Sequence, residues 1–267
     1  MTRLLSICLI KNWPQDKLML LGVAVIPVII LLVYIYLKDK NEREPLGLLL
    51  KAFFSGALVA VLILLWSLIE GISGFYLTSF ADNSAVLKSF FQAAIPEEGL
   101  KFLFLYWLIW KNKEFNEHFD GIVYAVFVSM GFACVENILY VLQGGYGVGI
   151  ARALLAVPGH FLFAVIMGYF FSRARFTLLK RSRLMAMAII CPILAHGLYD
   201  TICFAIDMYA ESDGLAGILS LVFIAFDIML WKMGLRAIQT HCHVCGAKIP
   251  KGKINCPYCE QLTEYLY

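Results

Sequence analysis

Charged residues are scarce in this chain of 267 amino acids: Asp, Glu, Lys and Arg make up 15% of it, whereas 61% of the residues are hydrophobic. A soluble globular domain carries about 25% charged residues, so the composition excludes an ordinary soluble protein. The period-2 alternation that is typical of membrane β-strands is missing. Internal repeats and low-complexity segments are missing too, which disfavours transporters built from inverted repeats.

The chain contains long runs of apolar residues instead. Seven of them reach the length of about 20 residues that a helix needs to cross a bilayer. They are expected near 18–37, 46–69, 90–110, 120–142, 151–171, 184–206 and 214–235. The sequence therefore predicts an all-α polytopic membrane protein, with a bundle of about seven transmembrane helices in residues 18–237.

Two other segments flank or interrupt these runs. Residues 1–17 hold an apolar stretch too short to span and no cleavage site, which disfavours a signal peptide and leaves an interfacial helix as an alternative. Glycines at 144, 145, 147 and 149 predict a flexible connector between the fourth and fifth spans, with a gate over a cavity as the alternative.

Basic residues concentrate in alternate loops. The loops after the first, third and fifth spans carry ten Lys and Arg residues, against five on the opposite side, among them Arg152. The positive-inside rule then places the N-terminus outside and the C-terminal tail in the cytoplasm. Because topology accounts for the basic loop 172–183, no nucleic-acid partner is expected.

The C-terminal residues 238–267 read as a separate module. Two short motifs, C-x2-C and C-P-x-C, are separated by ten residues. Together they contain four cysteines: Cys242, Cys245, Cys256 and Cys259. Four thiolates complete a tetrahedral Zn²⁺ site, and a cytoplasmic tail stays reduced, so structural zinc is preferred to disulfides. The flanking His241 and His243 are not needed as ligands. A closed site suits docking to a cytoplasmic partner or stability rather than catalysis.

Eight polar residues interrupt the apolar spans and form the candidate site: Glu97, Glu98, Lys101, Glu136, Asn137, His160, His196 and Asp200. A charge near the bilayer centre costs about 2.5–3.5 kcal/mol, so such residues need a reason. Helical spacing places Lys101 beside both glutamates, which a structural ion pair between helices would also explain. The same spacing lets the Asp200 carboxylate orient the His196 imidazole.

These residues share a depth. At about 1.5 Å of rise per residue, the acidic and imidazole groups lie roughly 9 to 15 Å below the outer ends of their spans. A shared polar cavity that opens outward is the simplest interpretation. Such a set suits water activation, either by a glutamate as general base or by a metal held by His and Glu side chains. The sequence contains no H-E-x-x-H pattern and suggests no Ser-His-Asp arrangement.

Several of these residues fall in short motifs of one family. The stretch P-E-E-G-L-K at 96–101 resembles the E-E-x-x-K motif of PrsW-type intramembrane proteases, and F-A-C-V-E-N-I-L-Y at 132–140 resembles their F-x-x-x-E-N-x-x-Y motif. His160 with Gly168, and H-G-L-Y-D at 196–200, follow in the expected order. Weaker marks are E-R-E-P at 42–45 and D-G-I-V-Y at 120–124. The resemblance covers about 38–206 and leaves the seventh span and the tail outside it.

The resemblance implies hydrolysis of a peptide bond in a membrane-anchored protein near its extracytoplasmic face, often an anti-sigma factor in stress signalling. It implies a bacterial cell membrane and a link to the CAAX-processing, glutamate-type membrane proteases. By the same analogy Glu97 is the water-activating base, helped by His160, with His196 and Asn137 as polarising or oxyanion groups. Glu98, Lys101, Glu136 and Asp200 would orient them.

Two other functions fit a membrane bundle with polar residues. A proton-coupled transporter or channel would line the full depth with them, whereas the inner halves of the third to sixth spans are nearly all apolar. A non-catalytic scaffold that presents the zinc module would have no need of this set of costly charged residues.

Overall fold

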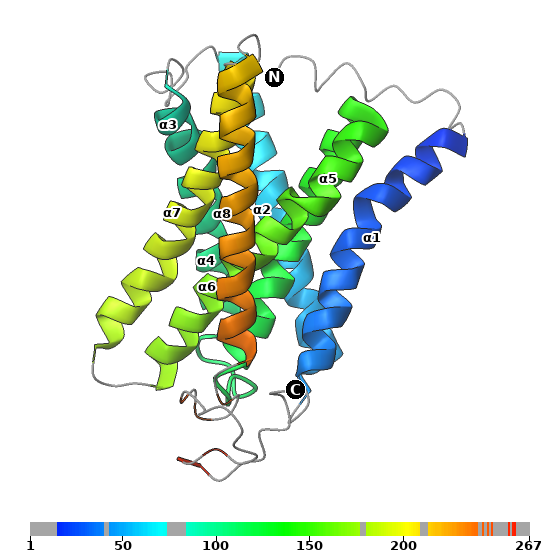
Figure 1. The fold of residues 1–267 in the computed structure, drawn as a ribbon. Helices are drawn as coiled ribbons and strands as arrows, with labels where there is room; N and C mark the ends of the chain where they lie inside the picture. Colours follow the sequence, from blue (N-terminus) through cyan, green and yellow to red (C-terminus); the bar gives the residue numbers. More distant parts are fainter. Residues whose placement is uncertain are drawn as a thin grey trace.

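The computed structural model describes residues 15–39, 43–73, 84–176, 180–208 and 213–239, and in the tail residues 242, 245, 247, 256, 258 and 259. All regular structure within these residues is helical. The elements are α1 (Gln15–Lys38), α2 (Leu46–Ser73), α3 (Ala85–Lys88), a π-helical turn η3 (Ser89–Ala94), α4 (Ile95–Ile109), α5 (Asp120–Leu154), α6 (Ala156–Phe176), α7 (Arg181–Met208) and α8 (Asp213–Gln239), shown in Figure 1. Most of the N-terminal segment 1–17 lies outside the described residues.

Within the described residues, four helical segments are long and apolar enough to cross a membrane: Lys17–Lys38, Leu46–Ser73, Asp120–Phe176 and Arg181–Ile206. The third contains α5 and α6 and therefore two of the expected spans. The expected spans 90–110 and 214–235 do not meet that criterion. Helix α4 has 15 residues and carries three charges, and the apolar stretch of α8 is Gly217–Met229. Both helices nevertheless run along the bundle in Figure 1, and the prediction of an all-α polytopic membrane protein is confirmed.

The chain reverses direction inside α5, at Gly145. This residue has φ 73° and ψ −161°, a conformation that only glycine adopts readily. A Cβ at Gly149 would lie 3.3 Å from the Val141 side chain, although residues eight apart on a straight helix are separated by about 12 Å. The predicted glycine-rich connector is therefore helical on both sides of one sharp turn, because a single residue absorbs the whole reversal.

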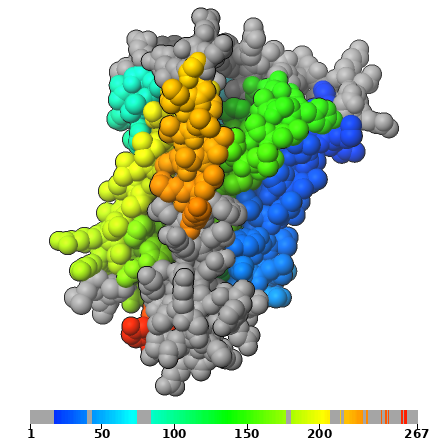
Figure 2. Space-filling view, viewed as in Figure 1, coloured from blue at the N-terminus to red at the C-terminus, as the bar shows by residue number. Residues whose placement is uncertain are grey.

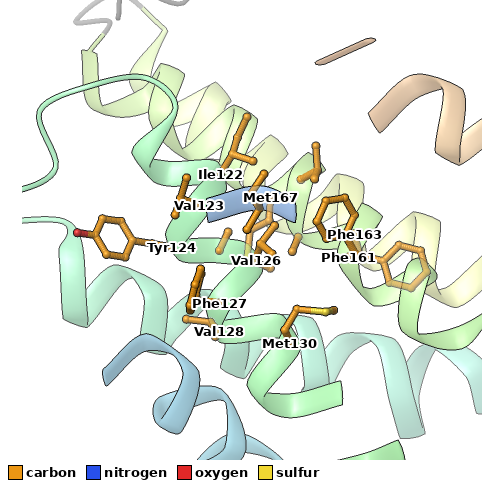
Figure 3. Packing of buried hydrophobic residues seen from close by; sticks show 14 of the residues in the cluster. Ile122, Val123, Tyr124, Val126, Phe127, Val128, Met130, Phe161, Phe163 and Met167 are labelled. Carbon is orange, nitrogen blue, oxygen red and sulfur yellow. The ribbon is translucent and has the colours of Figure 1, made fainter. Parts of the chain in front are cut away.

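The first half of α5 is the centre of the bundle. Every residue from 120 to 133 is buried, as expected for a helix that is apolar on all sides and surrounded by others. It packs against α1, α2, α4 and α6. Figure 3 shows Tyr124 and Met130 of α5 in the same cluster as Phe161, Phe163 and Met167 of α6. This buried core holds α5 and α6 as an antiparallel pair.

Glycines allow the central helix to approach its neighbours closely. A Cβ added at Gly56 of α2 would fall 1.7 Å from the Val128 carbonyl oxygen, and one at Gly131 would fall 1.8 Å from that of Phe53. Gly121 and Gly168 make a similar contact between α5 and α6. Small residues at such crossings are typical of membrane helix packing, where backbones must come close.

The helix ends can be grouped by the end of the bundle at which they lie. In Figure 1 the last residues of α1, α6 and α8 gather with the first residues of α2, α5 and α7 at the lower end. Figure 2 shows α8 lying across one face between α7 and α5. The three loops that the sequence analysis expects to be basic therefore share one end, as alternating spans require.

Candidate active site

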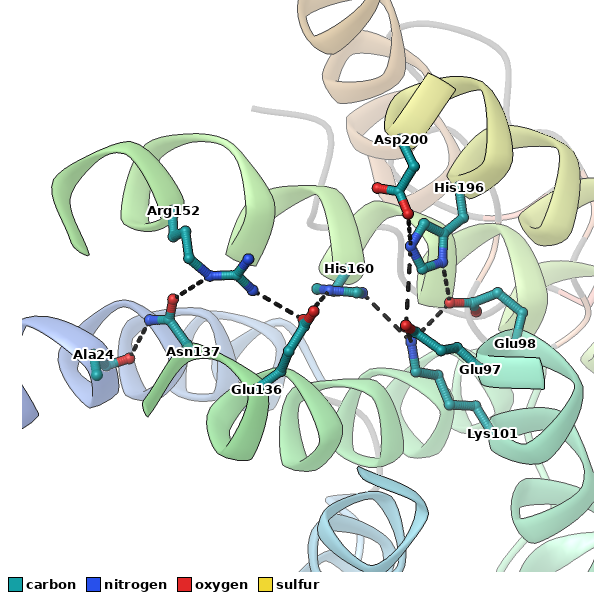
Figure 4. A network of polar contacts seen from close by, with 10 residues as sticks. All are labelled: Ala24, Glu97, Glu98, Lys101, Glu136, Asn137, Arg152, His160, His196 and Asp200. Atoms are coloured by element: carbon teal, nitrogen blue, oxygen red, sulfur yellow. Dashed lines mark hydrogen bonds and ion pairs between the residues drawn. The ribbon is translucent and has the colours of Figure 1, made fainter. Parts of the chain in front are cut away.

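All eight predicted site residues lie in one network of polar contacts, and Figure 4 shows them converging from α4, α5, α6 and α7. Five charged or ionisable members are almost fully buried: Glu97, Glu98, Lys101, His160 and His196. Glu136 and Asp200 are more open, with side chains 20% exposed. Residues from spans far apart in sequence thus form one cluster, as their common depth predicted.

Helix α4 supplies the centre of the cluster. It begins after the π-helical turn Ser89–Ala94, and Pro96 has no N–H to donate to the carbonyl four residues earlier. Glu97 and Glu98 follow directly after this proline, in the first turn of α4. Lys101 Nζ lies 2.7 Å from Glu98 Oε1 and 3.5 Å from Glu97 Oε2. The predicted ion pairs are present.

The two glutamates are engaged differently. Glu98 Oε1 faces both Lys101 and, at 3.0 Å, His196 Nδ1, and Glu98 is 0% exposed. Glu97 is 8% exposed, and its Oε2 accepts no hydrogen bond from the residues that the structure describes. Glu98 therefore ties α4 to α7, whereas the contacts of Glu97 Oε2 are longer, 3.5 Å to Lys101 Nζ and 4.0 Å to His196 Nε2.

His196 lies between carboxylates on both ring nitrogens. Its Nε2 is 3.4 Å from Asp200 Oδ2, the predicted pair on one face of α7. The ring stacks on Phe163 with centroids 4.9 Å apart, which fixes its plane. Gly197 beside it packs against the Phe90 ring, where a Cβ would come within 2.4 Å.

His160 is oriented by Glu136. Its Nε2 lies 2.9 Å from Glu136 Oε2, so a neutral ring donates this proton to the carboxylate. The Nδ1 lone pair then faces Lys101 Nζ at 3.4 Å, toward the centre of the cluster. A carboxylate behind an imidazole in this way sets which nitrogen is available to a metal or a proton.

Asn137 is turned away from the centre. Its Nδ2 donates to the Ala24 carbonyl of α1 at 2.7 Å, and its Oδ1 accepts from Arg152 Nε at 2.9 Å. In Figure 4 it lies beyond Glu136, on the side away from Glu97. This geometry argues against an oxyanion role for Asn137 and favours a positioning role.

Arg152 is a site residue that the sequence analysis counted only as a loop charge. Its Nη2 lies 2.9 Å from Glu136 Oε2, and the guanidinium sits 4.1 Å from the centre of the Tyr140 ring. Nothing in the spacing pairs residues 136 and 152, because on a straight helix they would be about 24 Å apart. The reversal at Gly145 brings them together.

The charge balance leaves room for a cation. The cluster contains two permanent cations and four carboxylates: Lys101 pairs with Glu97 and Glu98, Arg152 pairs with Glu136, and Asp200 lies beside His196. Donor atoms of Glu97, Glu98, His160 and His196 all lie within 4.8 Å of one another. Buried Oε2 atoms of both glutamates accept no hydrogen bond within the described ranges. Two carboxylates and two imidazoles suit a divalent transition metal, so these residues fit one.

The weaker family marks meet at the opposite end of α5. The Tyr124 hydroxyl donates a hydrogen bond to Glu44 Oε2, and Asp120 Oδ2 accepts from the backbone N–H groups of Asn116 and Glu117. Burial raises the pKa of the Glu44 carboxyl to about 7. This cluster joins the start of α2 to the start of α5. Glu42, the other acidic residue of the first mark, lies outside the described residues.

The four tail cysteines also lie together. Their Sγ atoms are all within 4.8 Å of one another, with Cys242 and Cys256 buried. The pairs Cys242–Cys259 and Cys245–Cys256 have Sγ···Sγ separations of 3.5 and 3.6 Å, too long for disulfides. The arrangement is compatible with a bound metal. His241 and His243 lie outside the described part of the tail.

Comparison with known proteins agrees with the site. Residues 44–230 match the family model described as PrsW family intramembrane metalloprotease, so the match includes most of α8, which the sequence analysis left outside the resemblance. The predicted end of the resemblance at about residue 206 was therefore wrong. The prediction rested on the motifs, and α8 carries none of them, although it packs on α6 and α7. No solved structure matches the chain.

Curated relatives cover nearly the same stretch. The chain is 36% identical over 220 residues to "Protease PrsW" of Geobacillus kaustophilus, covering 82% of this chain and 91% of that protein. It is 35% identical over 231 residues to the protein of that name from Clostridioides difficile, with 84% and 92% covered. It is 34% identical over 221 residues to "Protease PrsW" of Bacillus subtilis, covering 81% of this chain and 93% of that protein. The chain is thus an integral membrane protein that belongs to the PrsW family of intramembrane metalloproteases.

Proposed function

We propose that the cluster around Glu97 is the catalytic centre and that it hydrolyses a peptide bond in a membrane-anchored protein near the extracytoplasmic face. The observation that carries this proposal is the convergence of two glutamates and two histidines within 4.8 Å in an otherwise apolar bundle. Burying such groups is costly, so a set that converges supports a functional site. An anti-sigma factor is the substrate class that we prefer, by analogy with the family.

Glu97 is the general base of this proposal. Its ion-pair contacts are longer than those of Glu98, and its side chain is 11% exposed against 0% for Glu98, so water can reach it more readily. A general base must reach the proton that it abstracts, and Glu98 is less suited because it is fully buried and engaged with Lys101 and His196. Glu98 and Lys101 therefore hold α4 in place beside His196.

The histidines act on the same water or on the carbonyl oxygen of the substrate. His160 presents Nδ1 to the centre because Glu136 accepts its Nε2 proton. His196, held by Asp200, is the polarising group on the opposite side. After attack, Glu97 returns the proton to the leaving amine, as microscopic reversibility allows.

A catalytic metal is consistent with this set. Glu97, Glu98, His160 and His196 would hold it, and when bound it would supply Lewis-acid polarisation and an acidified water. The protein's own contribution is unchanged: it orients the donors through Glu136 and Asp200 and keeps the site apolar around them.

The tail is proposed as a separable zinc module on the cytoplasmic side. Four thiolates within 4.8 Å of one another match a closed structural Zn²⁺ site, and the segment 238–267 is too short to have a core of its own. The division into residues 1–17, 18–237 and 238–267 follows from this. A cytoplasmic protein is the expected partner of the module.

The proposal is tested by comparing the N-termini of membrane proteins in cells with the wild-type chain and with Glu97→Gln. New termini near the outer end of another protein's span are expected with the wild type, and their abundance should fall by about 100-fold or more in the variant. Glu114→Gln, the same change at the far end of the bundle, should leave them unchanged.

Each other outcome argues against a stated part of the proposal. Termini that persist with Glu97→Gln would remove Glu97 as the base. Termini at the cytoplasmic end of the substrate's span would reverse the predicted orientation. Identical termini in both strains under several stresses would contradict the protease role in these cells.

A further inference from the structure

We propose that Arg152 is a positioning residue of the peptidase site, which acts through Glu136 to hold the His160 ring with Nδ1 toward the α4 glutamates. The inference rests on the proposed function, since it assigns His160 to the catalytic centre. It adds a residue that belongs to none of the sequence motifs and lies on a different arm of the chain.

The side-chain contacts form a continuous chain from Arg152 through Glu136 to His160, called the relay below. Arg152 Nη2 lies 2.9 Å from Glu136 Oε2, and the same oxygen lies 2.9 Å from His160 Nε2. One carboxylate oxygen therefore accepts from the guanidinium and from the imidazole together, as Figure 4 shows. Charge-assisted hydrogen bonds of this kind are short and directional, so the guanidinium restricts where the carboxylate can point.

A second contact fixes the guanidinium itself. Arg152 Nε donates to Asn137 Oδ1 at 2.9 Å, and Asn137 Nδ2 donates to the Ala24 carbonyl of α1 at 2.7 Å. The planar guanidinium can make both bonds at once, which a lysine ammonium at the end of a flexible stem reproduces only in part. The face of the guanidinium also rests on the Tyr140 ring.

The effect on His160 concerns its tautomer. With Glu136 held as an acceptor behind Nε2, the neutral ring carries its proton there and leaves Nδ1 as the acceptor facing Lys101. If Glu136 is free to rotate, the Nε2 proton loses its partner, and the ring can turn away from Lys101 and carry its proton on either nitrogen. Arg152 thus determines which histidine atom is available at the centre.

Gly145 is what makes the relay possible. The turn at φ 73° folds residues 146–154 back along the first arm of α5, and this places Arg152 beside Glu136. Arg152 has a side chain only 15% exposed, at the outer side where the predicted topology has few basic residues. A charge there is costly, and the paired carboxylate offsets that cost.

The first test needs no substrate. Full-length protein labelled with ¹⁵N-histidine, in lipid nanodiscs, reports each ring's protonated nitrogen by NMR, and His160→Gln identifies the His160 signals. Wild type should show His160 protonated at Nε2 alone. Arg152→Gln should give a mixture of tautomers, and Arg152→Lys, which keeps the charge, should restore most of the wild-type signal. An unchanged His160 signal in Arg152→Gln overturns the proposal.

Gly145→Ala supports the same test if Arg152→Gln does not accumulate in the membrane. It leaves the arginine in place but disfavours the turn that brings it to Glu136. The same mixture of tautomers is expected, and a wild-type signal would also overturn the proposal. Arg173→Gln is the matched control: Arg173 likewise contacts an aromatic residue, Tyr169, but lies far from the cluster, and its His160 signal should be unchanged.

The second test measures cleavage of a substrate found through the Glu97 comparison. Arg152→Gln should lower kcat by about 10- to 100-fold, as loss of a group behind a catalytic ligand does. In a Glu136→Ala background the same change should cost about twofold or less, because the relay is already broken. Equal losses in both backgrounds would show that Arg152 acts without Glu136. Absence of wild-type cleavage would instead contradict the proposed function and leave the NMR result to decide the role of Arg152.

Discussion

Glu97 and Glu98 are neighbours in the sequence, but their roles differ because their surroundings differ. Glu98 is sealed between Lys101 and His196, and removing one partner of a buried pair costs about 3–5 kcal/mol. Glu97, one position earlier, has only longer contacts, 3.5 Å to Lys101 Nζ and 4.0 Å to His196 Nε2. The helix turns about 100° between them, so the two carboxylates leave α4 in different directions and meet different neighbours.

Glu44 shows that a single buried acid can make stability depend on pH. Burial raises the pKa of its carboxyl to about 7 from an ordinary value of 4.5, opposed by the hydrogen bond from Tyr124 and assisted by Asp39 and Glu114. The folded state therefore binds the proton more tightly than the unfolded state between these values. The stability that it contributes is complete below pH 4.5 and is lost as the pH rises through 7.

We expect Glu44→Gln to remove most of that pH dependence. The wild-type free energy of unfolding should fall by up to about 3 kcal/mol between pH 5 and pH 8 from this group, since one pKa unit corresponds to about 1.4 kcal/mol. Thermal unfolding in detergent at a series of pH values measures the slope. Glu70→Gln should keep the wild-type slope. A Glu44→Gln variant that is as pH-sensitive as the wild type would contradict the assignment.

At the scale of helices, close crossings decide how the site is assembled. Helix α5 carries Glu136 and Asn137 and meets α2 at Gly56 and Gly131, where no side chain fits between the backbones. A larger residue at either position must push the helices apart, because the atoms that it meets are backbone carbonyls. The site depends on α5 lying at this distance from its neighbours.

Gly56→Ala is therefore expected to destabilise the protein by about 1–3 kcal/mol, the usual cost of overpacking. Gly71→Ala on the same helix is a matched control: nothing lies within 4 Å of its added Cβ, and the change should stabilise α2 by about 0.5–1 kcal/mol. Melting temperatures in detergent compare the two. Equal melting temperatures for Gly56→Ala and Gly71→Ala would contradict a rigid backbone contact between α2 and α5.

At the scale of the whole molecule, polar groups occupy the two ends of α5 and apolar packing separates them. About 18 Å of helix lies between Tyr124 and Glu136, and the intervening side chains belong mostly to the buried core. A proton pathway through the bundle would need polar groups along that stretch. The arrangement favours a site that opens to one side, as a peptidase requires, over a channel.

The tail is expected to be separable from the bundle. Cys256→Ser should remove the tail zinc and leave cleavage of a minimal substrate within a few fold of wild type, because a closed site built from four cysteines needs every thiolate. Metal analysis of the purified protein measures zinc per chain, and cleavage is assayed in parallel. Loss of activity in this variant would show that the tail is part of the catalytic unit, and unchanged zinc would remove Cys256 as a ligand.

Composition and pattern alone determined the membrane class, most of the spans and most residues of the buried polar cluster, Arg152 excepted. Apolar length and the cost of intramembrane charge act locally, so each helix can be recognised without its neighbours, and shared depth is enough to group Glu97, Glu136, His160 and His196. The family motifs pointed to the same residues. The assignments of Glu97 as base and of structural zinc are still predictions.

Tertiary structure decided what each side chain faces. The turn at Gly145 brings Arg152 to Glu136, and α1 supplies the carbonyl that turns Asn137 away from the centre. Both depend on contacts between segments that are distant along the chain, which helical spacing does not encode. The difference between Glu97 and Glu98 has the same origin, because the packing of α7 against α4 places His196 Nδ1 3.0 Å from Glu98 Oε1 but His196 Nε2 4.0 Å from Glu97 Oε2.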